Sequence, residues 1–148
     1  MPVRMELSRI LIRELNDYQI IELREVAPGN GDGVSGGQIE GGRAFPIVIG
    51  LPEAQAIERR LKGIQIKRPQ THDLLANVVN ALGASLESIT INDLSDHTFF
   101  ATLDIKTADG KLIHVDSRPS DAIALGIAGG APIFVDDRVL EAASKDEP

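Results

Sequence analysis

Charged and hydroxyl side chains gather in the segment 115–125, which reads VDSRPSDAIAL. Asp116 and Asp121 lie on either side of Arg118, and Ser120 precedes the second aspartate. Carboxylates are preferred ligands of divalent cations, and a guanidinium matches the oxygen atoms of a phosphate group, so this spacing permits a metal–phosphate site. Ser120 and Asp121 also suit helix capping and compensation of the helix dipole. An ion pair between Asp116 and Arg118 would be purely structural, and the sequence leaves both interpretations open.

A second segment of the same kind is RPQTHD, at residues 68–73. We expect Thr71 to be the N-cap of a helix and Asp73 to lie in its first turn. His72 can act as a general acid or base or as a metal ligand, although a surface or hydrogen-bonding role is the commoner one for a first-turn histidine. Arg68 precedes this group as Arg118 precedes the other. If the two segments face one cleft, two arginines, three aspartates and one histidine converge there.

Helices follow both segments. Proline at the start and glycine at the end predict one helix from about Pro52 to Lys62, a second after residues 68–71 that stops near Gly83, and a third after residues 118–120 that stops near Gly129. The third helix is apolar on nearly every side, and the second carries an apolar stripe, so we expect both to be buried. Only their first turns would then reach solvent, where free backbone N–H groups favour anions. The stripe of the second helix consists of Leu74, Leu75, Val78, Val79 and Leu82.

Period-two alternation and turn residues predict the strands that carry these helices. In chain order the expected strands are 5–13, 18–26, 44–50, 86–93, 98–107, 111–117 and 132–135. The first two form a hairpin around Asn16-Asp17, the third is a buried strand, the fourth to sixth form a meander, and a short helix at 138–143 follows the last. The expected fold class is α+β, a mixed or antiparallel sheet with three to four helices in a single compact domain over residues 1–148.

The connection between the last two strands of the meander can be decided from the side-chain faces. A three-residue loop, Ala108-Asp109-Gly110, places Ile105 opposite Ile113 and keeps apolar residues on one face, as alternation requires. Gly110 would then take the left-handed position of a bulged loop. The same register places Asp104 across from His114 on the polar face, which we interpret as a cross-strand pair rather than a catalytic dyad.

Composition excludes several classes of function. The chain has 148 residues, no cysteine and a net charge of −7, which excludes disulfides and thiol catalysis. Non-specific nucleic-acid binding relies on positive charge, so a nucleic-acid role would need a local basic patch, a divalent metal or an oligomer. The N-terminus does not resemble a signal peptide, and no apolar run reaches transmembrane length, so we expect a cytoplasmic protein without a membrane partner. Half of the 14 glycines lie in residues 28–42, an expected mobile loop, and the tail 144–148 is expected to fray.

Over residues 44–140 the chain resembles the bifunctional nuclease (BFN) domain family. The motifs that carry the resemblance most specifically are RPQTHDLL and DSRPSDAIAL, within the longer matching segments PIVIG, EAQAIERRLKG and VNALGASLESITINDLSDHTFFATLDI. The resemblance implies a compact α+β domain that associates as a homodimer. It also implies nuclease activity on DNA and RNA. The motif positions that it carries over are Arg68, Thr71, His72, Asp73, Asp116, Arg118, Ser120 and Asp121.

Two functions follow as hypotheses. The leading one is a metal-assisted phosphodiesterase, in which Mg²⁺ or Mn²⁺ lowers the pKa of a bound water and His72 acts as general acid or base. The expected catalytic residues are His72, Asp73, Asp116 and Asp121, and the three aspartates are the expected metal ligands. The expected substrate-binding residues are Arg68, Thr71, Arg118 and Ser120. The alternative is a non-enzymatic regulatory module that binds a small anion or a partner protein at the same helix starts.

Overall fold

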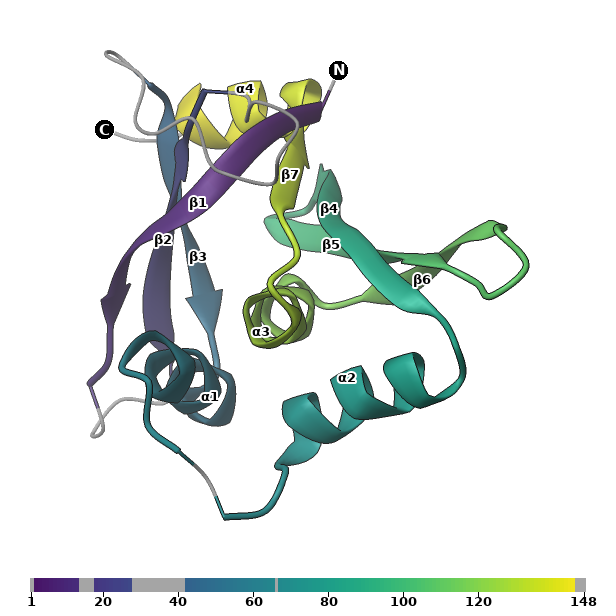
Figure 1. The fold of residues 1–148 in the computed structure, drawn as a ribbon. Coiled ribbons are helices and arrows are strands. Elements are labelled where there is room, and N and C mark those ends of the chain that lie inside the picture. The colour runs from purple at the N-terminus through teal and green to yellow at the C-terminus, as the bar shows by residue number, and fades with distance from the viewer. Residues whose placement is uncertain (1, 14–17, 28–41, 66, 146–148) are drawn as a thin grey trace.

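The computed structural model describes residues 2–13, 18–27, 42–65 and 67–145. These residues form one seven-stranded mixed sheet and four helices, which confirms the α+β class (Figure 1). The order of strands across the sheet is β3-β2-β1-β7-β4-β5-β6. The pair β4–β7 is parallel and the other neighbouring pairs are antiparallel, so the last strand of the chain joins the N-terminal and C-terminal parts of the sheet.

The N-terminal part of the sheet consists of β1 (Pro2–Leu11), β2 (Gln19–Glu25) and β3 (Ala44–Ile49). The pairing of β1 with β2 confirms the expected first hairpin, whose turn at Asn16-Asp17 lies outside the described residues. The glycine-rich segment likewise lies outside them, apart from Gly42. The strand β3 was expected to be buried, but it is the edge of the sheet and only alternate residues face the core.

The C-terminal part consists of β4 (Ser85–Ser95), β5 (Thr98–Lys106), β6 (Leu112–Ser117) and β7 (Ile133–Asp136). The first three of these strands form the expected meander, with each strand antiparallel to the next. The strand β6 is the other edge of the sheet and is almost entirely exposed.

The register that side-chain alternation selected for β5 and β6 is confirmed. Ile105 lies opposite Ile113, and Asp104 lies opposite His114. Gly110 has a φ of 87°, which is the left-handed conformation that the three-residue loop requires. The requirement for one apolar face was therefore sufficient to fix the connection.

The helices are α1 (Leu51–Leu61), α2 (Thr71–Ala81), α3 (Pro119–Gly129) and α4 (Asp137–Lys145). Their bounds lie within two residues of those expected from proline and glycine, because Pro is favoured in the first turn and Gly ends a helix in the left-handed conformation. The helix α4 follows β7 directly, and Asp136 Oδ1 accepts a hydrogen bond of 3.0 Å from the Arg138 N–H.

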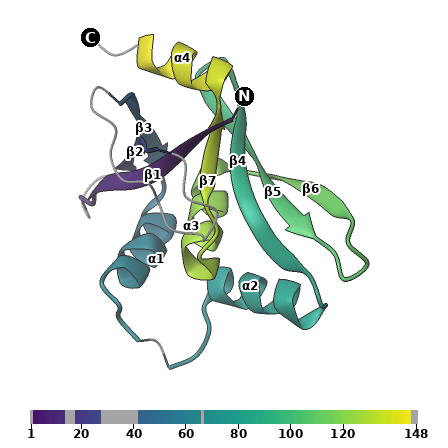
Figure 2. The ribbon, with the colours of Figure 1, turned by 45° about the horizontal axis from the view of Figure 1, so that its top comes forward.

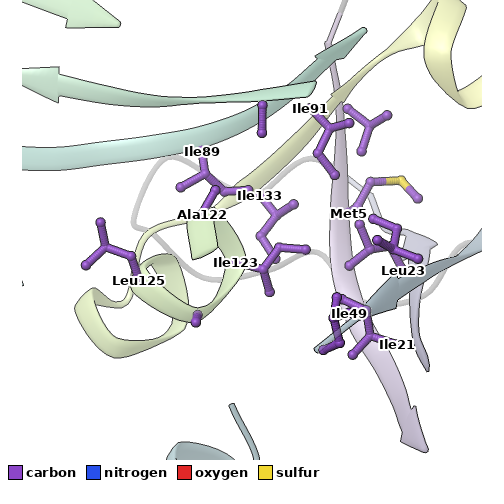
Figure 3. Packing of buried hydrophobic residues seen from close by; sticks show 14 of the residues in the cluster. Met5, Ile21, Leu23, Ile49, Ile89, Ile91, Ala122, Ile123, Leu125 and Ile133 are labelled. Carbon is purple, nitrogen blue, oxygen red and sulfur yellow. The ribbon is translucent and has the colours of Figure 1, made fainter. Parts of the chain in front are cut away.

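The helix α3 lies at the centre of the molecule. It runs beside the sheet, and α1 and α2 pack against it from two sides (Figure 1 and Figure 2). Its residues 119, 120 and 122–126 are buried, as its apolar character predicts. Ile123 and Leu125 point into the main apolar cluster, which also contains Ile21 and Ile91 of the sheet (Figure 3). Burial of each such side chain stabilises the fold by roughly 1.5–3 kcal/mol.

The expectation that α2 is a buried helix is wrong. None of its residues is fully buried, and only its Ala76 and Val79 pack against the core. The opposite side of the helix exposes a row of large apolar side chains one or two turns apart. The exposed fractions are 55% for Leu74, 43% for Leu75, 44% for Val78 and 76% for Leu82. Four of the five residues of the apolar stripe therefore face away from the single chain.

Candidate functional site at three helix starts

The first turn of α3 carries the centre of the site. Arg118 is the N-cap residue, and Pro119 occupies the first helical position, which suits proline because it needs no backbone donor there. The Arg118 guanidinium is held by two carboxylates at once. Its Nε donates to Asp121 Oδ2 at 2.9 Å, and its Nη2 donates to Glu53 Oε1 at 2.7 Å. The sequence suggested an ion pair between Arg118 and Asp116, but the arginine pairs with Asp121 and Glu53.

The first turn of α2 reaches the same carboxylate. His72 Nε2 lies 3.1 Å from Asp121 Oδ1, and the histidine side chain is 17% exposed. The starts of α2 and α3 therefore lie side by side, as the shared Arg-Pro pattern suggested. Asp121 bridges the two helices, since one of its oxygen atoms faces His72 and the other faces Arg118.

A third helix start contributes Glu53, which the sequence analysis missed. Glu53 lies in the first turn of α1, directly after Pro52, and is buried with 9% of its surface exposed. A first-turn acid after proline is usual compensation of the helix dipole, so no sequence signal distinguished it. The carboxylate packs so closely over Gly50 that a β-carbon there would meet Glu53 Oε2 at 2.6 Å. Glycine at position 50 thus leaves the space in which Glu53 reaches Arg118.

The charges of Asp121, Glu53 and Arg118 act together on His72. Asp121 and then Glu53 raise the pKa of Arg118, so the guanidinium stays protonated at every pH at which the protein is folded. Two carboxylates and one guanidinium leave one net negative charge next to His72. That charge favours the Nε2–H tautomer of the imidazole and leaves Nδ1 as the ring atom that can accept a proton.

A pocket of about 170 Å³ opens beside His72, between α1 and the first turn of α2. Arg59 and Arg60 of α1 line it, and Ala124 and Ala128 of α3 form part of its apolar wall. The Arg59 guanidinium donates a hydrogen bond to the Gln70 side chain and so joins the two helices. Two arginines and a helix N-terminus give the pocket an anion-binding character, which the sequence analysis did not assign to these arginines.

The other expected site residues are distributed as follows. Thr71 lines the pocket but is the first helical residue of α2, because Gln70 is the N-cap. Asp73 also lines the pocket, and its Oδ2 accepts the Gln70 N–H at 3.2 Å. Thr71 as N-cap was therefore wrong, whereas Asp73 lies in the first turn as expected. Ser120 is buried in the first turn of α3, 7% exposed.

Two expected residues neither line the pocket nor join the ion pairs around Arg118 and Asp121. Arg68 is exposed in the segment before α2, and the described residues show no ion pair to it. Asp116 is exposed on β6, opposite Thr102, on the face of the sheet that carries Asp104 and His114. The strand β6 ends at Ser117 and Arg118 is already the N-cap of α3, so Asp116 and Arg118 belong to different elements.

The three aspartates expected to bind a metal do not form a ligand set in this geometry. Both oxygen atoms of Asp121 already face cationic or imidazole partners, and Asp116 lies on the sheet. Over the described part of the chain, no group of three histidine or acidic side chains is arranged to hold a metal ion. We therefore derive no catalytic step through a metal from these residues.

Comparison with known proteins identifies the family. The bifunctional nuclease domain model matches residues 37–148, which include all three helix starts. Two proteins of Mycobacterium tuberculosis, Uncharacterized protein Rv1829 and Uncharacterized protein MT1877, are each 36% identical to this chain over 129 residues. The match covers 87% of this chain and 76% of each relative. Within the described residues, no helix is both long enough and apolar enough to cross a membrane. The chain belongs to the bifunctional nuclease domain family.

Proposed function

We propose that the helix-start site is a nuclease site that binds a phosphodiester of DNA or RNA in the arginine-lined pocket and hydrolyses it. The observation that carries the proposal is the placement of His72. Its imidazole lies between the Asp121 carboxylate, 3.1 Å away, and a pocket lined by Arg59 and Arg60. A histidine oriented by a carboxylate next to an anion pocket is the usual requirement for general acid–base chemistry at phosphorus. The family to which the chain belongs supports the same reaction by its name.

The roles of the residues follow from their contacts. Arg59 and Arg60 hold the phosphate oxygens, with the first-turn N–H groups of α2 as further donors. Asp121 fixes the ring of His72 so that Nδ1 accepts the proton of the attacking water or hydroxyl. Arg118 was assigned to the substrate from sequence, but its Nε and Nη2 donate to Asp121 and Glu53. In our proposal it positions Asp121.

The remaining expected residues have roles at the margin of the pocket. Thr71 and Asp73 line the pocket, so their side chains contact the substrate or its water. Arg68 is exposed on the segment that leads to α2 and contacts the nucleic-acid backbone outside the pocket. Ser120 supports the first turn of α3 from its buried position. When bound, Mg²⁺ or Mn²⁺ would supply an activated water, and whether Asp73, Asp116 or Asp121 binds it stays a prediction for experiment.

The proposal is tested by incubating the protein with labelled single-stranded and double-stranded DNA and RNA, with Mg²⁺, with Mn²⁺ and with chelator. We expect cleavage that His72→Ala lowers by at least about a hundredfold, the usual contribution of a general acid or base. Arg138→Ala is the matched control, because Arg138 is highly exposed on α4, far along the chain from the pocket residues. Equal cleavage by the wild type and His72→Ala would identify a contaminating nuclease and reject the site.

One observation favours the alternative function, a regulatory module that binds a small anion. The pocket holds about 170 Å³, enough for a single phosphate-sized group rather than a length of strand. A module of this kind binds inorganic phosphate or a mononucleotide without turnover, and Arg59→Ala weakens that binding. Binding without cleavage of any of the four nucleic acids would select the module over the nuclease.

We also propose that the protein is a homodimer and that the exposed apolar face of α2 is its contact surface. That face consists of Leu74, Leu75, Val78 and Leu82, and a monomer would leave it in water. A single helix face can contact its own copy about a twofold axis, which is the commonest symmetry of soluble oligomers. Nucleic acid is the proposed substrate partner, and location in the cytoplasm stays a prediction from the sequence.

A further inference from the structure

A buried carboxylate lies on the far face of the β4–β5–β6 part of the sheet. Asp104 of β5 is 6% exposed, and four side chains from three strands contact it. Ser88 and Thr90 of β4 each donate to Oδ2 at 2.7 Å. Thr102 donates to Oδ1 at 3.1 Å, and His114 Nδ1 of β6 lies 2.7 Å from the same atom. An apolar β-branched residue would stabilise a sheet more simply, so this charge needs another explanation.

The protonation of the group follows from its contacts. Burial alone would raise the pKa of Asp104, but hydrogen bonds from Thr90, Ser88, His114 and Thr102 together hold it below its usual value. The carboxylate is therefore ionised and can only accept hydrogen bonds. His114 Nδ1 must carry the hydrogen between them. When the ring is neutral, the opposite ring atom, Nε2, is an acceptor, and the side chain that carries it is 57% exposed.

The strand β4 is irregular on both sides of this carboxylate. Its pairing with β5 shifts between Leu86 and Ser88 and again between Ile91 and Asp93, so Glu87 and Asn92 are extra residues in two bulges. Both of them line a shallow hollow of about 550 Å³ over Asp104 and His114. Bulges redirect side chains and are frequent next to binding sites. Here they add a second carboxylate and an amide to the rim.

Most of the surface of the hollow is apolar, and the polar groups on it are mainly acceptors. The hydroxyl hydrogens of Ser88, Thr90 and Thr102 point to Asp104, so their oxygen lone pairs are what remains for a ligand. His114 Nε2 and the Glu87 carboxylate are further acceptors on the same hollow. Asp104 and Glu87 are both anionic, which repels phosphate. We propose that this hollow binds the ammonium or guanidinium group of a small organic amine, a cation that consists of donors only.

The amine hollow, defined by Glu87, Ser88, Thr90, Thr102, Asp104 and His114, is separate from the nuclease site. The side chains of Leu103 and Ile105 point to the opposite face of β5, where they are buried in the main core beside α3. The helix starts lie on that core side. The proposal for the hollow therefore does not depend on cleavage of nucleic acid, and either proposal can fail alone.

The test is a titration of the full chain, followed by the NMR signals of the His114 imidazole. Agmatine and spermidine represent free amines, and Nα-acetyl-lysine methylamide represents a lysine side chain of a peptide. Tetramethylammonium has the same charge without donors, and inorganic phosphate has the opposite charge. We expect the first three to shift the His114 signals in a saturable manner and the last two not to do so. The probe that binds more tightly identifies the source of the ammonium or guanidinium group.

Two variants decide whether the acceptors are responsible. Glu87→Gln preserves the size and shape of this exposed side chain at the rim and removes its charge. We therefore expect at least a threefold loss of affinity for agmatine with an unchanged fold. Thr90→Val removes one acceptor and one partner of Asp104, and its folding is checked by its far-ultraviolet spectrum. Glu141→Gln, an exposed acid on α4, is the matched control. Binding of tetramethylammonium as tight as that of agmatine, or unchanged affinity in Glu87→Gln, would overturn the proposal.

Discussion

At the scale of residues, the Asp121 carboxylate contacts α2 directly and is linked to α1 through Arg118. It faces His72 of α2 with one oxygen atom and Arg118 of α3 with the other, and Arg118 continues to Glu53 of α1. The sequence left open whether the starts of α2 and α3 converge, although both carry Arg-Pro before a polar first turn. Glu53 was not predictable, since it is 65 residues from Arg118 along the chain and its position also suits dipole compensation.

The group of side chains around Asp104 could be predicted only in part from the sequence. Side-chain alternation predicted the pair with His114, because the register of β5 and β6 follows from their apolar face. The contacts from Ser88 and Thr90 depend on β4, whose two bulges shift the pairing twice. No local pattern in the sequence marks those bulges, so a cluster across three strands could not be derived from it.

A residue-scale prediction concerns the stability that Asp104 provides. Replacement by asparagine, Asp104→Asn, removes the charge that four donors share, and we expect it to lower the free energy of unfolding by about 2–4 kcal/mol at neutral pH. Urea denaturation of both proteins measures the difference. Asp116→Asn is the control, since Asp116 is exposed on the same face of the sheet, and it should change stability by no more than about 0.5 kcal/mol.

The same carboxylate gives a prediction for pH. Its pKa is lower in the folded protein than the ordinary value of 3.8, so its contribution to stability is complete above that pH and is lost as the pH falls toward the folded-state pKa. We therefore expect the stability difference between wild type and Asp104→Asn to shrink below about pH 4. A difference that stays constant from pH 7 to pH 3 would show that the charge of Asp104 is not what the donors stabilise.

At the scale of elements, the positions of the helices followed from proline at their starts and glycine at their ends, but the environment of α2 did not. An apolar stripe indicates that one side of a helix is buried against other residues. It does not indicate whether those residues belong to the same chain. In α3 apolar residues lie on nearly every side of the helix, which predicts that the helix is buried within the chain. The structure confirms this burial. In α2 four residues of the stripe face outward, and the helix packs through Ala76 and the fifth stripe residue, Val79.

The exposed face of α2 leads to a prediction about assembly. If this face joins two copies, Leu75→Glu should convert a dimer to a monomer, because a carboxylate cannot be buried there without a partner. Light scattering coupled to size-exclusion chromatography measures the mass. Leu61→Glu is the matched control on α1, where the leucine is 55% exposed, and it should leave the mass unchanged. A wild type that is monomeric at every concentration would contradict the assigned surface.

The end of α3 provides a prediction about the backbone. Gly130 caps the helix with a φ of 73°, a conformation that costs other residues about 1 kcal/mol or more. We expect Gly130→Ala to lower the Tm by about 2–4 °C, as scales for a chain of this size. The neighbouring Gly129→Ala is the control, because it lies within the helix and its β-carbon would meet only Leu86, at 4.0 Å. An equal loss in both variants would show that the left-handed cap is not the cause.

At the scale of the whole molecule, two faces of one domain carry opposite chemistry. The helix side presents an arginine-lined pocket, and the open face of the C-terminal strands presents a hollow of acceptors around Asp104. A net charge of −7 is compatible with phosphate binding, since Arg59 and Arg60 in the last turn of α1 place positive charge locally beside the first turn of α2. The α+β class and the meander were predictable, whereas the convergence of the helix starts and the outward face of α2 depend on tertiary packing.

The most direct test of this account is the rate of phosphodiester cleavage by wild type, His72→Ala and Arg138→Ala on the same labelled RNA and DNA. The account predicts cleavage by the wild type and by Arg138→Ala at the same rate, and a loss of at least about a hundredfold in His72→Ala. Folding of all three proteins is checked by thermal denaturation before the rates are compared. Full activity in a correctly folded His72→Ala protein would contradict the assignment of chemistry to the helix starts.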